Sequence, residues 1–506
     1  MKCTPGKAFD LALPDGVRVS DLTGSQTLDH AALAPLVTAV AARLGELGVG
    51  PGVVILYQGP QQAAALVLFW ASMIVGGVFV PVDEGWPAFQ LAHAAGRLAP
   101  GLVVTTSAAA AAVFPDAASL HLDGGTDFGG LSALADWAAG TEGTGATAIV
   151  PATAAGACLY TSGSSGTPKA VVLSRAALIQ SARSTIDAFG WEPGERLVNL
   201  PDPHTMSGLR NAFLAAPLGG VEWVPLPGPD RGDLFSLIEK LALARCQRLV
   251  IGPLLLRQLA LLGARVPAAM FDGLKAIYCT GAPLDATSAA RMHARWGVPV
   301  INYYGLTETA GLCLSQRLSG WRPGDVGLGH PVDCQARLVG ADGVISSTDV
   351  EGELQIRSAR LMSGYLGDAQ ASAERFDGDW LRTGDLARRR ADGSYELVGR
   401  IGHFINTLAT ERIQPEEIEQ VLERHDEVVE AAVFGRPEPG GGERIIALVV
   451  PAPVADAARD LTPMLAEFAA EHLGLGRRPS LILLVESLPR QNNGKLLRHR
   501  LPELAQ

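Results

Sequence analysis

Lysine is scarce in this chain of 506 residues, which has six lysines among its 41 basic residues and a net charge of −11. A nucleic-acid partner is therefore not expected, because binding to a phosphate backbone relies on a surplus of positive charge. Two of the six lysines, Lys169 and Lys495, stand in short glycine-containing motifs. That placement fits a role in site chemistry better than a role on a solvated surface.

Cysteine pairs and a signal-like N-terminal segment are also missing. The six cysteines form no CxxC pair, and the first residues contain no apolar stretch typical of a secretory signal. A chain of this length can bury a sufficient core without disulfides. We therefore expect free, buried thiols, a reducing compartment and a cytoplasmic location.

One hydrophobic run, residues 63–82 (AAALVLFWASMIVGGVFVPV), is long enough to cross a bilayer. The consecutive glycines Gly76 and Gly77 interrupt it, and VFVPVD is typical of a short buried strand that leads into a loop. We predict a core helix followed by a core strand, and no membrane span.

Apolar helical patterns alternate with short β-branched runs over most of the chain, which predicts an α/β fold with helices over mostly parallel sheets. From about Val332, strands joined by Gly/Asp turns indicate a β-rich subdomain, and a new pattern begins after Gly399-Arg400. We place the domains at residues 1–398 and 403–506, with a hinge at 399–402. The clearest helical patterns lie at 33–47, 415–425 and 462–473, and the clearest strand patterns at 53–57, 197–201, 221–226, 248–252, 276–281 and 298–305.

An anion-binding segment is indicated by the string LYTSGSSGTPKAVVLSR at residues 159–175. Its glycines let the backbone approach a ligand closely, and its hydroxyls and ammonium group are suitable donors to phosphoryl oxygens. It is not a Walker A motif, because no Gly-Lys-Ser/Thr is present, and by composition alone a Ser/Gly-rich turn remains the alternative. The candidate ligands are Thr161, Ser162, Gly163, Ser164, Ser165, Gly166, Thr167 and Lys169.

This string resembles the phosphate loop of the adenylate-forming superfamily, which includes acyl-CoA synthetases, peptide-synthetase adenylation domains and luciferases. Further segments resemble the other motifs of that superfamily and follow in the same order. They are Gly281-Ala282-Pro283-Leu284, Tyr303-Tyr304-Gly305-Leu306-Thr307-Glu308, Trp380-Leu381-Arg382-Thr383-Gly384-Asp385, Gly399-Arg400 and Leu488-Pro489-Arg490-Gln491-Asn492-Asn493-Gly494-Lys495. The resemblance covers essentially the whole chain and implies a large N-terminal domain of stacked α/β layers with a small, mobile α+β cap.

The resemblance implies nucleotide-binding roles for several of these residues. The segment that contains Gly281, Ala282 and Pro283 would pack against adenine, as would the aromatic face of Tyr304. Asp385 would accept both ribose hydroxyls, a role that needs an ionised acceptor, and the hinge arginine Arg400 would contact the nucleotide.

The resemblance also implies the reaction and its catalytic groups. A substrate carboxylate would attack the α-phosphate of ATP, pyrophosphate would leave, and an acceptor thiol would then reach the acyl-adenylate. Thr307 would hydrogen-bond a phosphate and Glu308 would bind Mg²⁺. Lys495 would bridge the substrate carboxylate and the α-phosphate and neutralise the charge that builds up between them.

The segment Leu200–Leu209 bears on the type of acid. Peptide-synthetase adenylation domains carry an aspartate there that pairs with the substrate amine, whereas this segment resembles the Pro-x-x-His-x-x-Gly pattern of acyl- and aryl-CoA ligases. His204 would lie at the mouth of the acyl pocket, and a satisfied loop histidine is the alternative. We therefore expect an apolar acyl or aryl acid without an α-amine.

The hinge and the following loop depart from the superfamily pattern. Gly402 stands where Asp or Lys is usual, Asn406 where Lys is usual, and Ala409-Thr410 where a glycine is usual. In the superfamily this loop lines the pantetheine tunnel, so added bulk there would impair thioester formation while adenylation survives. Neutral drift is the alternative.

Three functions stay open: an adenylating enzyme with an impaired thioester step, a complete acyl-CoA ligase, and a scaffold that activates a non-carboxylate oxyacid. ATP and Mg²⁺ are expected in each, with CoA or a carrier protein as the candidate acceptor.

Overall fold

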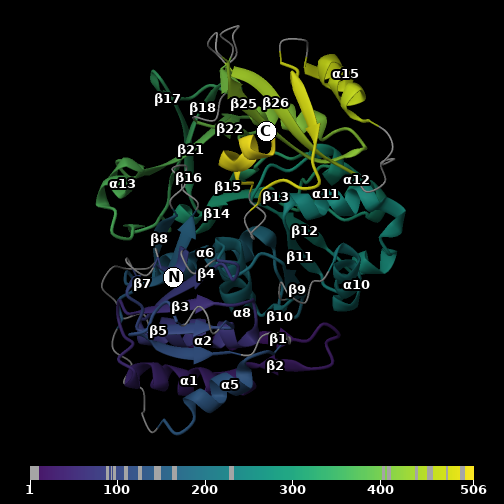
Figure 1. The fold of residues 1–506 in the computed structure, drawn as a ribbon. Coiled ribbons are helices and arrows are strands. Elements are labelled where there is room, and N and C mark those ends of the chain that lie inside the picture. Colours follow the sequence, from purple (N-terminus) through teal and green to yellow (C-terminus); the bar gives the residue numbers. More distant parts are fainter. Residues whose placement is uncertain are drawn as a thin grey trace.

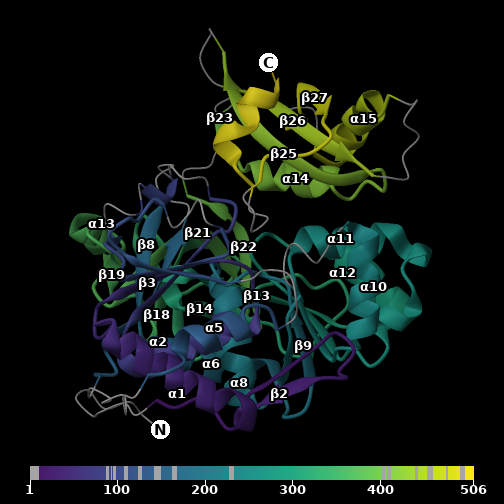
Figure 2. The ribbon, with the colours of Figure 1, turned by 60° about the horizontal axis from the view of Figure 1, so that its bottom comes forward.

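The structure is a computed structural model that describes residues 11–86, 90–92, 94, 98–107, 112–122, 128–141, 150–161, 168–226, 233–401, 405–406, 412–438, 443–452, 460–473, 477–490 and 496–505. All structural statements concern these residues. A large N-terminal domain of mixed α/β layers carries a smaller C-terminal unit, as predicted, and the two are separate bodies in Figure 2.

One sheet of the N-terminal domain has parallel inner strands that are buried on both faces. Alternate residues of β3 face different clusters: Ile55 and Tyr57 join one apolar core, while Val54 and Leu56 join another. This is the burial that parallel strands covered on both sides require. The described strands run in the order β19 (Gly364–Tyr365), β8 (Lys169–Ser174), β7 (Ala155–Thr161), β4 (Val78–Val82), β3 (Val54–Gln58), β5 (Leu102–Thr105) and β6 (Ala118–His121).

A second sheet lies on the other side of a layer of helices (Figures 1 and 2). Helices α2, α6 and the helical segment 206–219 share one apolar core with residues from both sheets. The order is β15 (His330–Pro331), β14 (Gly311–Ser315), β13 (Val300–Leu306), β12 (Ala276–Cys279), β11 (Arg248–Ile251), β9 (Arg196–Asn199), β10 (Glu222–Val224), β1 (Arg18–Ser20) and β2 (Thr27–Asp29).

Most described helices of the N-terminal domain fill this central layer or cover the outer face of the second sheet, while the helical residues Leu91, Ala94 and Leu98 pack on the outer face of the first sheet. The main ones are α1 (His30–Glu46), α2 (Ala63–Val75), α5 (Leu131–Ala138), α6 (Arg175–Phe189), α7 (Met206–Gly208), the π-helix η1 (Leu209–Ala215), α8 (Ala216–Gly219), α10 (Leu234–Ala244), α11 (Pro253–Leu262) and α12 (Ala286–Trp296).

The hydrophobic run at 63–82 forms a core helix and a core strand, as predicted. Helix α2 ends at Val75, Gly76 adopts a left-handed φ of 83°, and β4 follows. A left-handed residue ends a helix readily, and glycine adopts that conformation without steric cost. No helix within the described ranges is long and apolar enough to span a membrane.

The predicted β-rich subdomain is an antiparallel sheet (Figure 1). Its strands contribute to one apolar core that includes Leu354 and Tyr395. Its strands are β17 (Gly343–Ile345), β16 (Gln335–Gly340), β18 (Glu351–Arg357), β21 (Trp380–Arg389) and β20 (Phe376–Asp377), with β22 (Tyr395–Arg400) paired to β21 and α13 (Ala369–Glu374) beside β20.

The C-terminal unit is an α+β sheet with helices on both faces. It contains β23 (Ile405–Asn406), β24 (Arg412–Ile413), α14 (Pro415–Leu422), β25 (Val428–Pro437), β26 (Glu443–Pro451), α15 (Thr462–Leu473), β27 (Leu481–Leu484) and the 3₁₀ helix η5 (Arg498–Ala505). The helix predicted at 415–425 ends at Leu422, because Arg424 and His425 instead donate to Val421 and Leu422 in tight turns.

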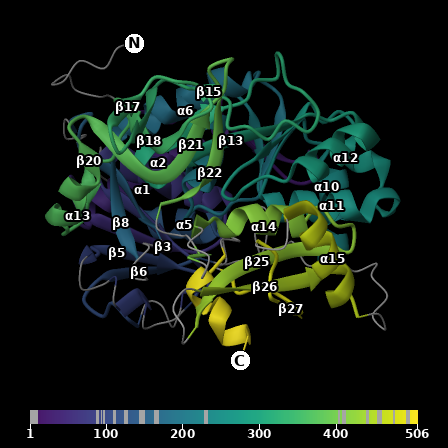
Figure 3. The same ribbon diagram turned by 90° about the horizontal axis from the view of Figure 1, so that it is seen from above.

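A buried arginine on α11 ties the two units together. Arg257 donates to the Val428 carbonyl at 3.0 Å and lies 3.5 Å from Glu423 Oε2. Figure 3 shows α14 and β25 beside α11. This contact fixes the orientation of the C-terminal unit in the structure.

The cysteines in the described part of the chain are free thiols, as predicted. Burial raises the pKa of the Cys158 and Cys246 thiols to about 12, so both remain protonated and unreactive near neutral pH. Cys3 lies outside the described residues.

Candidate active site

Three of the predicted segments follow parallel strands of the second sheet. His204 follows β9, Gly281–Pro283 follow β12, and Glu308 follows β13, and these strands run parallel through β11. The carboxyl ends of parallel strands meet at one edge of a sheet, and ligands of such folds bind outside that edge. Sequence segments that lie up to about a hundred residues apart therefore converge.

The first sheet brings its own polar groups to the same region. Asp83 follows β4 and Thr161 ends β7, and these two strands are parallel. The Asp83 Oδ2 atom lies 3.9 Å from His204 Nε2, so the ends of the two sheets meet there. His204 is mostly buried, and its Nε2 has no hydrogen-bond partner among the described residues. His204 therefore keeps Asp83 as its acidic neighbour and an Nε2 atom that is able to bind a further group.

The anion-binding segment is held at both ends. Thr161 pairs with Lys169 across the β7–β8 ladder, and its hydroxyl donates to the Lys169 carbonyl at 3.4 Å. The predicted ligands Ser162, Gly163, Ser164, Ser165, Gly166 and Thr167 lie outside the described residues. The hairpin frame that would present them is nevertheless defined.

Glu308 is the buried acid of the site. The Tyr365 hydroxyl donates to Glu308 Oε1 at 2.8 Å, and the Arg375 guanidinium lies 3.9 Å from the same oxygen. The Lys169 ammonium lies 5.1 Å from the centroid of the Tyr365 ring. Burial and the Glu308 charge raise the pKa of Tyr365, which keeps its hydroxyl a donor. These contacts link β8, β13 and β19 into one electrostatic cluster.

Glu308 could hold a Mg²⁺ ion only if a bound ligand, such as a phosphate group, completed the coordination of the ion. In the described ranges no group of three or more His, Cys, Asp or Glu side chains could hold a metal ion. Mg²⁺ commonly binds through one or two carboxylates and completes its shell with water and phosphate oxygens. Glu308 Oε1 is engaged by Tyr365, and a carboxylate still has lone pairs available for such an ion.

The turn that carries Thr307 and Glu308 is rigidly placed. The Thr309 hydroxyl donates to the Gly311 carbonyl at 2.7 Å, the Met362 amide donates to the Glu308 carbonyl at 2.8 Å, and Ser181 donates to the Ala310 carbonyl at 2.5 Å. A side chain fixed by such a framework keeps its geometry at the moment of reaction.

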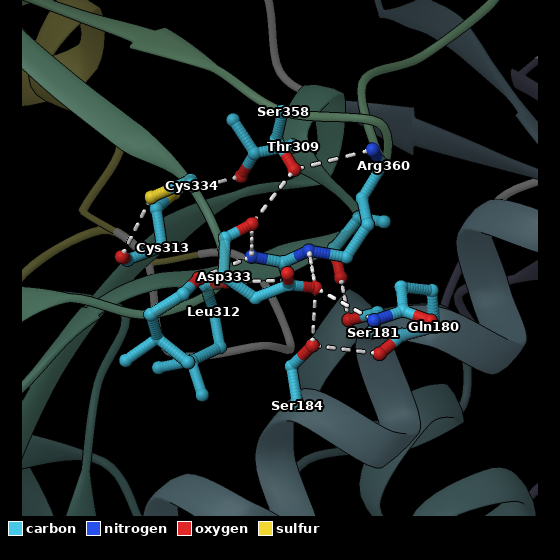
Figure 4. Close-up of polar contacts among 12 residues, drawn as sticks. Gln180, Ser181, Ser184, Thr309, Leu312, Cys313, Asp333, Cys334, Ser358 and Arg360 are labelled. Atoms are coloured by element: carbon cyan, nitrogen blue, oxygen red, sulfur yellow. Dashed lines mark hydrogen bonds and ion pairs between the residues drawn. The ribbon is translucent and has the colours of Figure 1, made fainter. Parts of the chain in front are cut away.

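A polar network behind this turn explains its rigidity (Figure 4). The buried guanidinium of Arg360 donates to the Leu312 carbonyl at 2.8 Å and the Val332 carbonyl at 2.5 Å. Asp333 lies 3.5 Å from Arg360 Nε and accepts from Ser184 on α6 at 2.8 Å. The network therefore joins α6 to the strand that follows Glu308.

Asp385 forms the second acidic group of the site, on β21. The Tyr304 hydroxyl donates to Asp385 Oδ2 at 2.5 Å, and Arg400 Nε lies 2.8 Å from Oδ1. Burial and the Asp385 charge raise the pKa of Tyr304 well above its ordinary value. An ionised carboxylate accepts about four hydrogen bonds, so Asp385 can still accept from two hydroxyls of a ligand.

The segment Gly281–Pro283 is exposed beyond β12. Gly281 has a left-handed φ of 96°, and no atom would lie within 4 Å of a Cβ placed there. Glycine is therefore required by the backbone conformation, and the space in front of it is open.

Not every contact was foreseen. Tyr365 and Arg375 were not predicted, because their partner Glu308 lies more than 55 residues away in sequence. The predicted catalytic residue Lys495 lies outside the described residues. The ends of its loop are defined, since Arg490 pairs with Leu496 and the Leu497 amide donates to the Pro489 carbonyl at 2.8 Å.

Comparison with known families now adds an independent result. The family of AMP-binding enzymes matches residues 12–366, and the AMP-binding enzyme C-terminal domain matches residues 417–495. The chain belongs to the AMP-binding enzyme family. It is therefore a ligase-type enzyme of the adenylate-forming group that its motifs resemble.

Individual relatives support the same assignment. A probable non-canonical nonribosomal peptide synthetase, CymA of Salinispora arenicola, is 28% identical over 97% of this chain, which spans only 6% of that protein. The oxalate–CoA ligase of Arabidopsis thaliana is 26% identical over 95% of this chain and 94% of its own length. The crystal structure of ATP-bound MatB from Rhodopseudomonas palustris has the same fold, with a TM-score of 0.85. The two chains are 24% identical, and the match covers 98% of this chain and 96% of the MatB chain.

One prediction concerns the acidic group on β21. Asp385→Ala should weaken ATP binding at least about tenfold, because hydrogen bonds to a buried charged acceptor are lost. Calorimetric titration with ATP measures this change. Asp377→Ala is the matched control, since Asp377 is an exposed carboxylate on neighbouring β20 that pairs with Arg337. Equal ATP affinity for wild type and Asp385→Ala would contradict the ribose role.

Proposed function

We propose that the enzyme activates a carboxylic acid with ATP, forming an acyl-adenylate and releasing pyrophosphate. The observation that carries this proposal is the convergence of Glu308, Asp385 and the Lys169 hairpin at one edge of the sheets. Glu308 would face the phosphates and Asp385 the ribose, so that the α-phosphate would lie between them. Pyrophosphate release that depends on both ATP and an acid tests the proposal.

The proposed reaction needs positioning and charge neutralisation more than proton transfer. A substrate carboxylate oxygen forms a bond to the α-phosphorus while the bond from that phosphorus to the bridging oxygen breaks, and pyrophosphate leaves with the electron pair. Mg²⁺ held through Glu308 would supply positive charge to the phosphates. Lys169, Thr161 and Thr307 would orient the phosphates, and Lys495 would join the two reacting anions.

We further propose that adenine lies along Gly281, Ala282 and Pro283, next to Tyr304, and that Arg400 holds the nucleotide through Asp385. The exposure of Gly281–Pro283 and the Arg400–Asp385 contact support this placement. Arg400 ends β22 and the Ile401 amide still donates to the Gly384 carbonyl at 2.9 Å. These contacts support the proposed hinge at residues 399–402, between proposed domains at 1–398 and 403–506.

The acid is proposed to lack an α-amine. His204 stands at the edge where the acyl group would enter, within a segment that resembles that of acyl- and aryl-CoA ligases, and its Nε2 lies 3.9 Å from Asp83 Oδ2. An apolar acyl or aryl body is the expectation from sequence. The alternative product is an acyl-CoA thioester, made by a complete CoA ligase. The name of one relative, an oxalate–CoA ligase, supports this alternative, with a small acid as the substrate and CoA as the acceptor.

The acceptor is the least determined part of the reaction. The departures at Gly402, Ala409 and Thr410 lie outside the described residues, so the case for an impaired thioester step rests on the sequence. A carrier protein is an alternative acceptor that the peptide-synthetase relative supports by its name. Activation of a non-carboxylate oxyacid remains a further alternative, which an acid panel that includes sulfonates tests.

A second prediction follows for the acceptor. The enzyme should release pyrophosphate from ATP and its acid without CoA, and added CoA should give little thioester. Mass spectrometry of the products with and without CoA measures this outcome. Restoring the usual glycine by Ala409→Gly with Thr410 deleted should increase thioester yield. Rapid, saturable acyl-CoA formation by the unaltered enzyme would instead establish a complete CoA ligase.

A further inference from the structure

Arg210 is a fully buried arginine for which the described residues supply no acidic partner. Its Nε donates to Asn211 Oδ1 at 3.0 Å, and its guanidinium carbon lies 5.6 Å from the centroid of the Tyr303 ring. Its Nη2 has no hydrogen-bond partner in the described part of the chain. The groups that act on its charge are Tyr303, Cys313 and the second cation Arg360, and none is a carboxylate.

Two other buried arginines of the domain, Arg248 and Arg360, do have an acidic partner. Arg248 lies 2.8 Å from Glu195 Oε2, and Arg360 lies 3.5 Å from Asp333 Oδ2. A guanidinium stays ionised under nearly all conditions, and a buried charge is strongly unfavourable unless an opposite charge and hydrogen bonds compensate it. Cation–π contact with Tyr303 compensates only part of that cost. An anionic ligand would supply the opposite charge that no described acidic side chain provides to Arg210.

Arg210 lies close to the proposed reaction site. A Cβ atom on Gly311 would overlap Arg210 Nη1, and Gly311 comes three residues after Glu308. His204, at the edge of the sheet, precedes Arg210 by six residues, and the helical segment that carries Arg210 begins at Met206. An acid that enters past His204 with its reacting carboxylate toward the Glu308 turn would extend its far end along this helix toward Arg210.

The surroundings of Arg210 are polar and pre-organised. Ser207 and Tyr303 share a hydrogen bond of 2.8 Å between their hydroxyls, and Asn211 donates to Asn199 Oδ1 at 3.0 Å and Ser207 Oγ at 3.2 Å. Asn211, like Arg210, lies in the π-helix Leu209–Ala215. π-Helices are rare in proteins and often occur at functional sites. Such a lining is unsuited to a purely apolar acyl chain.

We propose that Arg210 recognises a second anionic group at the far end of the acid, in the simplest case a carboxylate, so that the substrate class is a diacid. This inference rests on the proposed function and names its substrate more closely. The planar guanidinium presents paired N–H donors that match a carboxylate. A diacid would carry an anionic group where the sequence analysis expects an apolar far end. The diacid hypothesis and the apolar-acid hypothesis therefore predict opposite substrate preferences.

The test uses matched pairs of acids with equal carbon count, one monocarboxylic and one dicarboxylic, in aliphatic and aromatic series. The readout is the ratio of kcat/KM for pyrophosphate release, diacid over monoacid. Wild type should give a ratio above about 10, and Arg210→Met should lower it roughly 10- to 100-fold, as loss of a charge-assisted hydrogen bond does. Arg210→Lys should retain an intermediate ratio.

Arg175→Met is the control, because Arg175 is also buried but lies at the start of α6, where it donates to the Val150 carbonyl at 2.8 Å. It should leave the ratio unchanged. A monoacid preference in wild type, or a ratio unaltered in both Arg210 variants, would overturn the inference and leave the proposed function standing. No pyrophosphate release with any acid, in protein that still binds ATP, would overturn the proposed function itself. If Arg210→Met does not fold, the wild-type ratio and Arg210→Lys decide.

Discussion

Lys495→Ala is expected to lower the rate of acyl-adenylate formation by about 10³-fold while the protein stays folded. One positioned positive charge between a carboxylate and an α-phosphate has an effect of this order, because the two anions must approach each other in the transition state. Acid-dependent pyrophosphate release under single-turnover conditions measures the change.

The described ends of the loop support the expectation that the substitution is local. The backbones of Arg490 and Leu496 form an isolated antiparallel β-bridge, and the Arg490 side chain forms an ion pair with the buried acid Glu430 on β25. Both ends of the loop are therefore held by contacts between described residues. Lys240→Ala on α10 is the matched control and should leave the rate unchanged. An undiminished rate in well-folded Lys495→Ala would remove this lysine from the mechanism.

Glu308→Gln is expected to lower turnover by about 10²-fold and to raise the Mg²⁺ concentration needed for half-maximal rate. Glutamine keeps the shape of the side chain and can still accept from Tyr365, but it loses the charge that a hard cation requires. Pyrophosphate release measured over a Mg²⁺ titration gives both quantities, and added Mg²⁺ should restore part of the rate.

The matched control for this substitution is Glu351→Gln, which removes a partly exposed carboxylate on β18 that pairs with Arg388. It should change neither the rate nor the Mg²⁺ dependence. Unchanged ATP affinity in Glu308→Gln would separate the effect from a loss of nucleotide binding. If Glu308→Gln kept the wild-type Mg²⁺ dependence, the metal-binding role of Glu308 would be wrong.

Much of the local structure was predictable because it depends on short-range patterns. Strand β3 and helix α15 follow from runs of apolar residues with the right period, and residues 63–82 became a helix and a strand because Gly76 ends the helix. The family assignment was also predictable, since the motifs from Thr161 to Lys495 occur in a fixed order and the family comparison confirms it.

The ends of elements were less predictable. The last turn of a helix depends on which groups satisfy its free carbonyls. After Leu422 the chain forms turns that lead directly into β25, so the apolar pattern that continues to His425 does not extend α14.

Only the tertiary structure decided which polar groups share a site. Tyr304 and Asp385 are 81 residues apart, and Glu308 and Tyr365 are 57 apart, yet each pair forms a hydrogen bond because separate sheets end in the same region. The sequence alone determined the family and the order of the motifs, and it predicted which residues would bind the nucleotide. It could not show that Arg210 has no acidic partner among the described residues, because a side chain's neighbours are set by long-range packing, and a missing neighbour leaves no pattern in the chain.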